Sequence, residues 1–396
     1  MTHRQTEFLY LNIGHFLDHF VLLIFATAAA LQLTVEWDMR YAELIPWATP
    51  RFIAFGVCAI PAGWLAYRWS RPGMMVVFFF GIGFACLLAA RSGSPAEMAL
   101  ALTVLGVFAA IYHPVGLSMV VQGRLKTGMA LAVNGVWGNL GVASAALVTG
   151  VMIDHVGWRG AFVATGVLCL LTAIAYSVFV RRPVPEHKPD ADQSTAVSVP
   201  DLPRATLIRV FGVIFFTTAV GGLVFQSTTF ALPKILDERL SALTVSATDV
   251  GVYSFLVFSL AAFAQLVVGH LLDRSDVRRV FAVVALSQAV LFAAMISLDG
   301  IPALIVAIGF MLAVFGQIPI NDVLVGRLAK SAWRSRAYAA RYIVTFSVMA
   351  SAVPLIGWIH GGWGFGALFA VLAVAASAIF LGTLLLPGGN ALKQQA

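Results

Sequence analysis

Long apolar runs follow one another along almost the whole chain, and they constrain its fold more than any other feature. Hydrophobic residues make up 60% of the chain, charged residues only 11%, and the mean hydropathy is +0.91. A helix needs about 20 mostly apolar residues to cross a bilayer. The runs are too long and too apolar for the strands of a membrane barrel. They predict an all-α membrane protein with twelve transmembrane helices, at residues 8–33, 43–66, 73–91, 96–121, 128–152, 159–180, 207–234, 247–271, 279–298, 302–326, 336–357 and 364–386.

Basic side chains are distributed unevenly between the predicted loops. Twelve spans place both termini on one side of the membrane, and most of the 25 Lys and Arg residues fall on that side. Loops rich in Lys and Arg remain in the cytoplasm. We therefore expect a multi-pass protein of the cell inner (plasma) membrane with both termini cytoplasmic. The net charge of +7 reflects this topology and predicts no nucleic-acid partner.

One long polar segment, residues 181–206, divides the chain and is predicted to be a flexible cytoplasmic linker. It separates a six-helix bundle at 1–180 from a second six-helix bundle at 207–396, which ends in a short cytoplasmic tail. Three pairs of short segments are similar between the halves, in the same order: 63–71 with 269–279, 123–125 with 326–328, and 155–158 with 360–363. These pairs predict a duplicated six-helix unit.

The segment Gly-His-Leu-Leu-Asp-Arg-Ser-Asp-Val-Arg-Arg at 269–279 resembles the cytoplasmic loop signature of the major facilitator superfamily. The copy in the first half has Tyr67 where that signature has an acid. The resemblance implies two six-helix bundles around a central cavity that opens alternately to each side of the membrane. It also implies a gating role for the charged residues Arg68, Arg71, Asp273, Arg274, Arg278 and Arg279; the alternative is that the positive charges only determine the topology. Asp322, towards the cytoplasmic end of its span, and Arg341 are further gating candidates by their position. For Arg341 we weigh an ion pair with Asp322 against extension of the side chain to the cytoplasmic surface.

Two further segments resemble a narrower group. Residues 111–116, Ile-Tyr-His-Pro-Val-Gly, and 138–141, Gly-Asn-Leu-Gly, are similar to motifs of fosmidomycin-resistance-type efflux proteins. This resemblance implies export of the transported compound, and hence an antiporter if the export is driven by protons.

Asp18 is an acid in the middle of the first apolar span. A carboxylate at bilayer depth is costly and usually marks the path of an ion, proton or substrate. At 100° per residue, Asn12, His15, Asp18 and His19 share one face of the helix. A carboxyl group held away from water binds a proton more readily, and histidine titrates near neutral pH. We therefore predict proton coupling through Asp18, with His15, His19 and His113 as relay groups; the alternative is a structural hydrogen-bonded cluster.

Other polar residues inside the spans are candidates to line a substrate cavity: Asn12, Arg51, Tyr112, Asn134, Trp137, Asn139, Gln226 and Gln265. Arg51 lies deep in the second span, where it can pair with Asp18, bind an anionic substrate, or lie on a helix that runs nearer the surface. Pro114 removes a backbone donor and bends the fourth helix beside Tyr112 and His113. A cavity with many aromatic and few charged residues suits a lipophilic solute.

The function that these features favour is secondary active transport, with proton-coupled efflux of a small organic solute. No nucleotide-binding motif or nucleophile–base arrangement is present, so we expect neither an enzyme nor a cofactor. The expected partners are the solute, protons and the lipid bilayer, and the expected state is a monomer. A second hypothesis is a transition-metal transporter using His15, Asp18, His19 and His113, although the lack of Met or Cys at ligand spacing favours no metal site. A third is a membrane sensor on a transporter fold.

Overall fold

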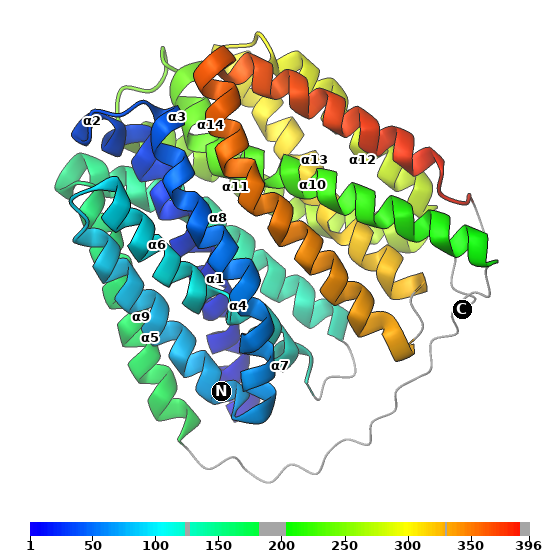
Figure 1. Ribbon diagram of the computed structural model, residues 1–396, viewed down its shortest axis with the longest axis horizontal. Coiled ribbons are helices and arrows are strands. Elements are labelled where there is room, and N and C mark those ends of the chain that lie inside the picture. The colour runs from blue at the N-terminus through cyan, green and yellow to red at the C-terminus, as the bar shows by residue number, and fades with distance from the viewer. Residues whose placement is uncertain (123–126, 182–202, 329–330, 389–396) are drawn as a thin grey trace. The chain divides into compact units, whose positions relative to one another are not determined.

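The computed structural model describes residues 1–122, 127–181, 203–328 and 331–388, and these residues form helices joined by short loops (Figure 1). Eleven helical segments in this described part are long and apolar enough to cross a membrane. The last of them, within α14 (Ser331–Leu384), is interrupted at Gly364, where φ is +73° and the backbone is not helical. Because this glycine separates two helices, the segments agree with the twelve predicted spans. The chain is an all-α, multi-pass membrane protein.

The chain divides into two compact units, one comprising Met1–Gln193 with Leu243–Leu256 and the other Ser194–Ala242 with Val257–Ala396. We call them the first and second unit. Most of the predicted linker at 181–206 lies outside the described residues, so its boundaries remain a prediction.

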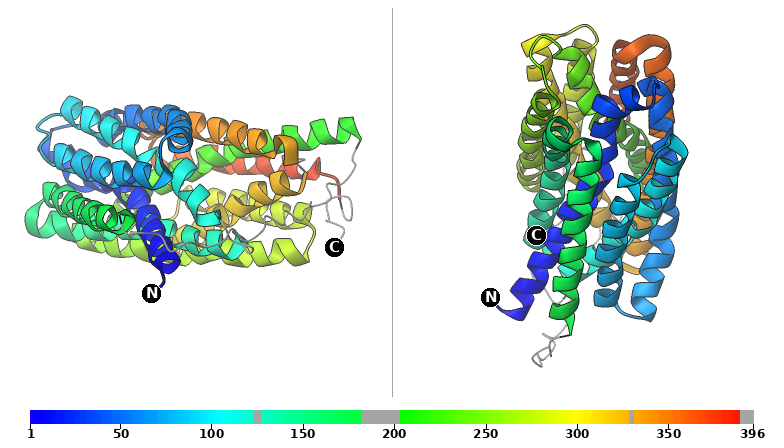
Figure 2. Two further views of the ribbon diagram at one scale, coloured as in Figure 1. Left: turned by 90° about the horizontal axis from the view of Figure 1, so that it is seen from below. Right: turned by 90° about the vertical axis from the view of Figure 1, so that its left-hand side faces the viewer.

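The first unit begins with α1 (His3–Ala28), which continues through η1 (Ala29–Leu33) into α2 (Thr34–Glu36). Its other elements are α3 (Tyr41–Leu44), η2 (Ile45–Ala48), α4 (Thr49–Arg68), α5 (Arg71–Ala90), α6 (Pro95–Ala109), η3 (Tyr112–Gly116), α7 (Leu117–Val121), α8 (Thr127–Val156) and α9 (Trp158–Val180). Within this unit α1 packs on α8, α5 on α9 and α4 on α6 (Figure 2). α1 also contacts η3, α5 and α9, so elements far apart in sequence pack against it.

Short polar residues set where several helices begin. The side chain of Ser70 accepts a hydrogen bond from Gly73 N at the start of α5, and that of Ser94 accepts one from Glu97 N at the start of α6. Both helices carry Pro in the first turn, where its missing N–H is not needed. These signals position the loops between consecutive spans.

A π-helical turn, η3, replaces regular helix at Tyr112–Gly116. Pro114 in this turn has no N–H to donate to the preceding turn, so the helix between α6 and α7 widens there. The widened turn contains both Tyr112 and His113, which the candidate site uses.

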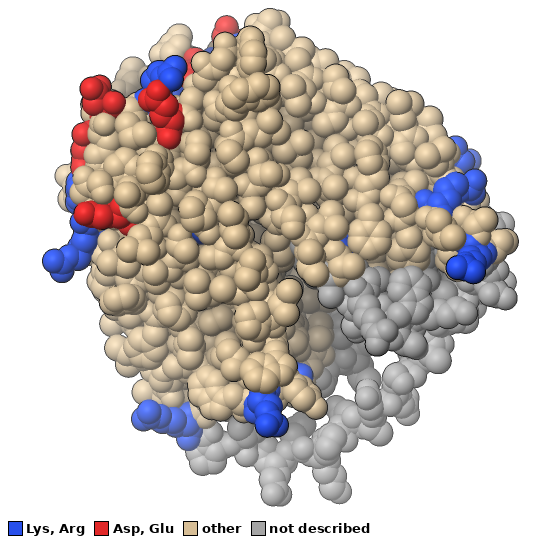
Figure 3. Space-filling view, viewed as in Figure 1, with Lys and Arg blue, Asp and Glu red and all other residues tan. Residues whose placement is uncertain are grey.

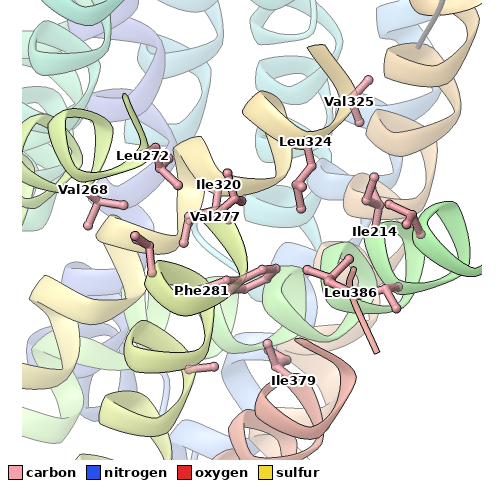
Figure 4. Close-up of a cluster of buried hydrophobic side chains, with 14 residues drawn as sticks. Ile214, Val268, Leu272, Val277, Phe281, Ile320, Leu324, Val325, Ile379 and Leu386 are labelled. Carbon is pink, nitrogen blue, oxygen red and sulfur yellow. The ribbon is translucent and has the colours of Figure 1, made fainter. Parts of the chain in front are cut away.

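The second unit contains α10 (Arg204–Arg239), α12 (Val277–Met295), α13 (Gly300–Leu328), α14 and most of α11 (Ala247–Arg274). Here α10 packs on α14, and α12 packs on both α13 and α14. Its core is largely aliphatic: Ile214, Leu272, Phe281, Ile320, Leu324 and Ile379 are at most 1% exposed and point toward one another (Figure 4). Apolar burial therefore holds these helices together.

Apolar side chains also cover the outside of the helices. On α4, Ile53, Val57, Ile60 and Trp64 are more than half exposed at helical spacing, so one complete face of this helix is apolar and open. Figure 3 shows that charged side chains gather near helix ends, whereas the middles of the helices in view are largely without them. This distribution is that of a protein surrounded by lipid.

Candidate functional site

Four residues predicted for proton coupling come together in the first unit. His15, Asp18 and His19 lie on α1, and His113 lies on η3. The Nε2 atom of His113 is 3.5 Å from Oδ2 of Asp18, and the Nε2 atoms of His15 and His19 are 3.2 Å apart. One ring nitrogen from each of the three histidines lies within 4.8 Å of the others. We call these four residues the histidine–aspartate cluster.

The carboxyl group of Asp18 is fully buried, with 0% of its side chain exposed. Neither oxygen accepts a hydrogen bond from any described residue. Burying a charged carboxylate without hydrogen bonds costs several kcal/mol, so such a group is stabilised by a proton or a nearby cation. The side chain of His113 is 22% exposed, and His19 is also partly exposed. The arrangement thus joins a buried acid to a partly exposed histidine.

The orientation of His15 is determined by the backbone of α8. Its Nδ1 lies 2.7 Å from the carbonyl oxygen of Asn134. A carbonyl oxygen only accepts, so Nδ1 carries the hydrogen and donates it. In the neutral ring Nε2 is then the acceptor, and the 3.2 Å contact places an N–H of His19 as its donor.

Three of the predicted cavity residues form a buried network around His15. The hydroxyl of Tyr112 donates to the carbonyl oxygen of Leu11 at 2.8 Å, and Nδ2 of Asn134 donates to Oδ1 of Asn12 at 2.9 Å. The Tyr112 ring stacks on the His15 ring, with centroids 4.9 Å apart and planes at 19°. Asn12, Tyr112 and Asn134 therefore position His15 and connect α1, η3 and α8.

Two glycines of α8 allow α1 to approach closely. A Cβ atom on Gly138 would lie 2.7 Å from Nε2 of His15, and one on Gly141 would lie 2.1 Å from the carbonyl oxygen of Phe16. Both distances are below contact distance, so neither position accepts even alanine without displacement of its neighbours.

The remaining predicted cavity residues are spread over both units. Arg51 is fully buried in α4, and its guanidinium lies 4.4 Å from the centre of the Phe52 ring. Asn139 is buried and Trp137 partly buried in α8. Gln226 on α10 is buried and Gln265 on α11 is partly buried, both in the second unit. Their role in binding a substrate remains a prediction.

A comparison with known protein families identifies the family of this chain. The profile of the Major Facilitator Superfamily matches residues 11–259, well over half of the chain. The chain belongs to the Major Facilitator Superfamily. It is therefore a secondary transporter and not an enzyme. No curated protein matches it.

Solved structures show the same major facilitator fold at low sequence identity. The xylose transporter XylE from E. coli, in an inward-open conformation, has a TM-score of 0.77 and 11% identity, over 98% of this chain and 97% of that one. A D-xylose-proton symporter has a TM-score of 0.73 and 14% identity, over 97% and 98%. A bacterial homologue of the human lysosomal transporter Spinster has a TM-score of 0.70 and 14% identity, over 97% and 94%.

The residues expected to gate this major facilitator transporter fall into two groups. In the second unit, Nη1 of Arg341 donates to Oδ1 of Asp322; the Arg341 side chain is only 10% exposed. The others lie at helix ends: Arg68, Asp273, Arg274 and Arg279 are exposed, Arg278 is partly buried, and Arg71 donates to Oε1 of Gln122 at 2.9 Å. No ion pair of Asp273 occurs within the described residues. Gating by these residues remains a prediction.

Two polar contacts inside the second unit were not predicted from the sequence. Nε2 of Gln288 donates to Oε1 of Gln317 at 2.7 Å, and the Thr217 hydroxyl donates to Oδ1 of Asn321 at 3.1 Å. All four side chains are buried. The amide side chains inside apolar spans could have indicated these contacts, because a polar group in lipid requires a hydrogen-bond partner.

Proposed function

We propose that this chain is a proton-coupled secondary transporter that exports a small organic solute by alternating access. The observation that carries the proposal is the buried carboxyl group of Asp18, which accepts no hydrogen bond from the described residues and lies 3.5 Å from Nε2 of His113. In a superfamily transporter, a buried acid of this kind is suited to bind and release the coupling ion.

The proposed coupling follows from electrostatics. With a proton bound, Asp18 is neutral and is stable in its apolar surroundings. When the site opens to water, the carboxylate becomes hydrated and can lose the proton. His113, which is partly exposed, provides a route for the proton. The contact between His15 and His19 extends this route along α1. A proton symporter among the proteins of similar fold supports the proton as coupling ion.

The direction and class of cargo rest on other features. Export follows from the resemblance of residues 111–116 and 138–141 to fosmidomycin-resistance-type efflux proteins. A lipophilic cargo fits the aromatic surroundings, in which Phe55 and Tyr112 lie edge-on to His113 at centroid distances of 6.0 and 5.8 Å. We further propose a monomer in the inner membrane with cytoplasmic termini, in which Arg51 of the first unit contacts the cargo.

The test uses the full-length protein in proteoliposomes with an imposed pH gradient. A panel of small lipophilic solutes is screened for proton movement, reported by a pH-sensitive dye, and the most active solute is then followed directly. Asp18→Asn should abolish gradient-driven accumulation but preserve solute exchange without a gradient. Glu97→Gln is the matched control, because Glu97 is an exposed acid at the start of α6 and should leave both activities unchanged. Full gradient-driven transport by Asp18→Asn would remove Asp18 from the mechanism.

A further inference from the structure

We propose that His15, His19 and His113 form a binding site for a divalent first-row transition-metal ion. The site lies wholly within the first unit. This inference goes beyond proton-coupled transport, because it concerns equilibrium binding of an ion and can be measured on purified protein without any transport.

The spacing of the first two histidines suits a metal ion. His15 and His19 are four residues apart on one helix, which places both rings on the same face. The same i, i+4 spacing provides two zinc ligands in helical His-x-x-x-His motifs. Two nitrogens that each lie about 2.0–2.1 Å from a tetrahedral ion are roughly 3.3 Å apart. The measured separation of the two Nε2 atoms is 3.2 Å.

The surroundings of His15 are also those of a metal ligand. Metal-binding histidines usually donate their second ring N–H to a carbonyl or carboxylate, which sets the tautomer and the ring orientation. The Nδ1 of His15 does this to the Asn134 carbonyl at 2.7 Å, so its Nε2 lone pair points at His19. Binding an ion would require the hydrogen of His19 to move from Nε2 to Nδ1, a change between neutral tautomers with no net loss of a proton.

His113 supplies the third nitrogen and Asp18 the charge. The three ring nitrogens lie within 4.8 Å of one another, so His113 would have to move by at most roughly 1.5 Å to complete a tetrahedral arrangement. It is on the π-helical turn η3, and its side chain is 22% exposed. The buried Asp18 carboxylate beside it can act as a fourth ligand or balance the charge of the ion.

The donor set indicates the class of ion. Imidazole nitrogens with a carboxylate suit Zn²⁺, Co²⁺, Ni²⁺ and Cu²⁺ rather than Mg²⁺ or Ca²⁺, which prefer oxygen, or Cu⁺, which prefers sulfur. A doubly charged cation would also stabilise a carboxylate that accepts no hydrogen bond from the described residues. The burial of Asp18 is thus compatible with either a proton or a metal ion as its partner.

The experiment titrates Co²⁺ into full-length protein purified without a polyhistidine tag. We expect one Co²⁺ per chain, a visible absorption spectrum typical of nitrogen coordination, and displacement by Zn²⁺. His15→Gln, His19→Gln and His113→Gln should each weaken binding at least tenfold. His155→Gln and His360→Gln are the matched controls, since neither residue belongs to the cluster. Both should leave the affinity for Co²⁺ unchanged. Absent or non-stoichiometric binding, or equal losses in the controls, would overturn the proposal.

A second measurement covers the case in which a variant fails to fold. In the wild-type protein, Co²⁺ should protect His15, His19 and His113, but not His155, from diethyl pyrocarbonate, as detected by mass spectrometry of peptides; equal modification with and without Co²⁺ would also overturn the proposal. Asp18→Asn separates the two hypotheses. It should retain the nitrogen-ligand spectrum with reduced affinity, while gradient-driven transport is lost. Loss of transport in Asp18→Asn together with no Co²⁺ binding in the wild type would reject the metal site alone.

Discussion

The two units differ most in the middle of their helices. The first unit has groups that change charge there, three histidines and a buried aspartate, whereas the second pairs neutral groups, Gln288 with Gln317 and Thr217 with Asn321. A titratable group can exchange protons or bind metal ions, but an amide or hydroxyl can only donate and accept hydrogen bonds. The cluster of titratable side chains that we propose for proton coupling and metal binding thus lies in the first unit alone.

The ends of the two units are more alike. In the first, Glu36 accepts hydrogen bonds from Trp158 Nε1 at 2.6 Å and Arg159 Nη1 at 2.8 Å. In the second, Glu238 contacts His360 Nε2 at 3.0 Å. In each unit, an acid near the end of the first long helix contacts one of the two similar segments. Glu36 contacts Trp158 of segment 155–158 and the next residue, Arg159, and Glu238 contacts His360 of segment 360–363. The two units therefore have similar contacts at these helix ends but different polar groups in the middle of their helices.

The greatest loss of stability is expected where α1 and α8 pack closely in the first unit. Gly141→Ala should destabilise the protein by about 3 kcal/mol, because the added Cβ would meet the Phe16 carbonyl oxygen at 2.1 Å and backbone cannot move aside easily. Gly222→Ala in the second unit should be neutral, since its nearest atom would be 3.7 Å away. Thermal unfolding in detergent measures both. Equal stability of the two variants would show that α1 and α8 do not need this close approach.

The next effect tests the ion pair between Arg341 and Asp322 in the second unit. Arg341→Ala should destabilise the protein by about 2 kcal/mol, because it removes a charged partner of Asp322 and the packing of a largely buried side chain. The double variant Arg341→Ala/Asp322→Asn should cost less than the sum of the single changes. A double-mutant cycle on unfolding free energies gives the coupling. If the effects of the two single changes on the unfolding free energy simply added in the double variant, the pair would contribute nothing to stability.

A smaller effect is expected at the amide pair of the second unit. Gln288→Leu leaves the amide of Gln317 without this partner and should cost about 1–2 kcal/mol. Gln288→Leu/Gln317→Leu removes both groups and should recover part of that stability. Both variants should retain gradient-driven transport. If either abolished it with normal folding, the ion chemistry would not be confined to the first unit.

The smallest effect concerns the charged loops after α4 and α11. An exposed charge contributes up to about 1 kcal/mol, which changes the ratio of inward-open to outward-open molecules about fivefold. Asp273→Asn should therefore raise labelling of an introduced cytoplasmic-side cysteine by up to about this factor, and Tyr67→Phe should leave it unchanged. Labelling rates with a membrane-impermeant thiol reagent provide the measurement. The same change in both variants, or none in either, would contradict a larger gating role for the second loop.

Much of the fold was predictable because it depends on local composition. Long apolar runs must become helices in lipid, where every backbone polar group needs an internal partner. Even the split of α14 at Gly364 agrees with two separate apolar runs at 336–357 and 364–386. Part of the site was also predictable. His15 and His19 share a face by the helical repeat, and an acid within an apolar run identified Asp18.

Which groups meet across helices depends on the tertiary structure and could not be predicted. Nothing local places His113 beside Asp18, pairs Gln288 with Gln317, or buries Arg51 fully. The contact that orients His15 was beyond sequence reasoning altogether, because it uses the backbone carbonyl of Asn134, a group that every residue has. Helical periodicity determines the face on which a side chain lies. The partner on that face depends on helix packing, which in turn depends on close approaches such as that of Gly141 to Phe16.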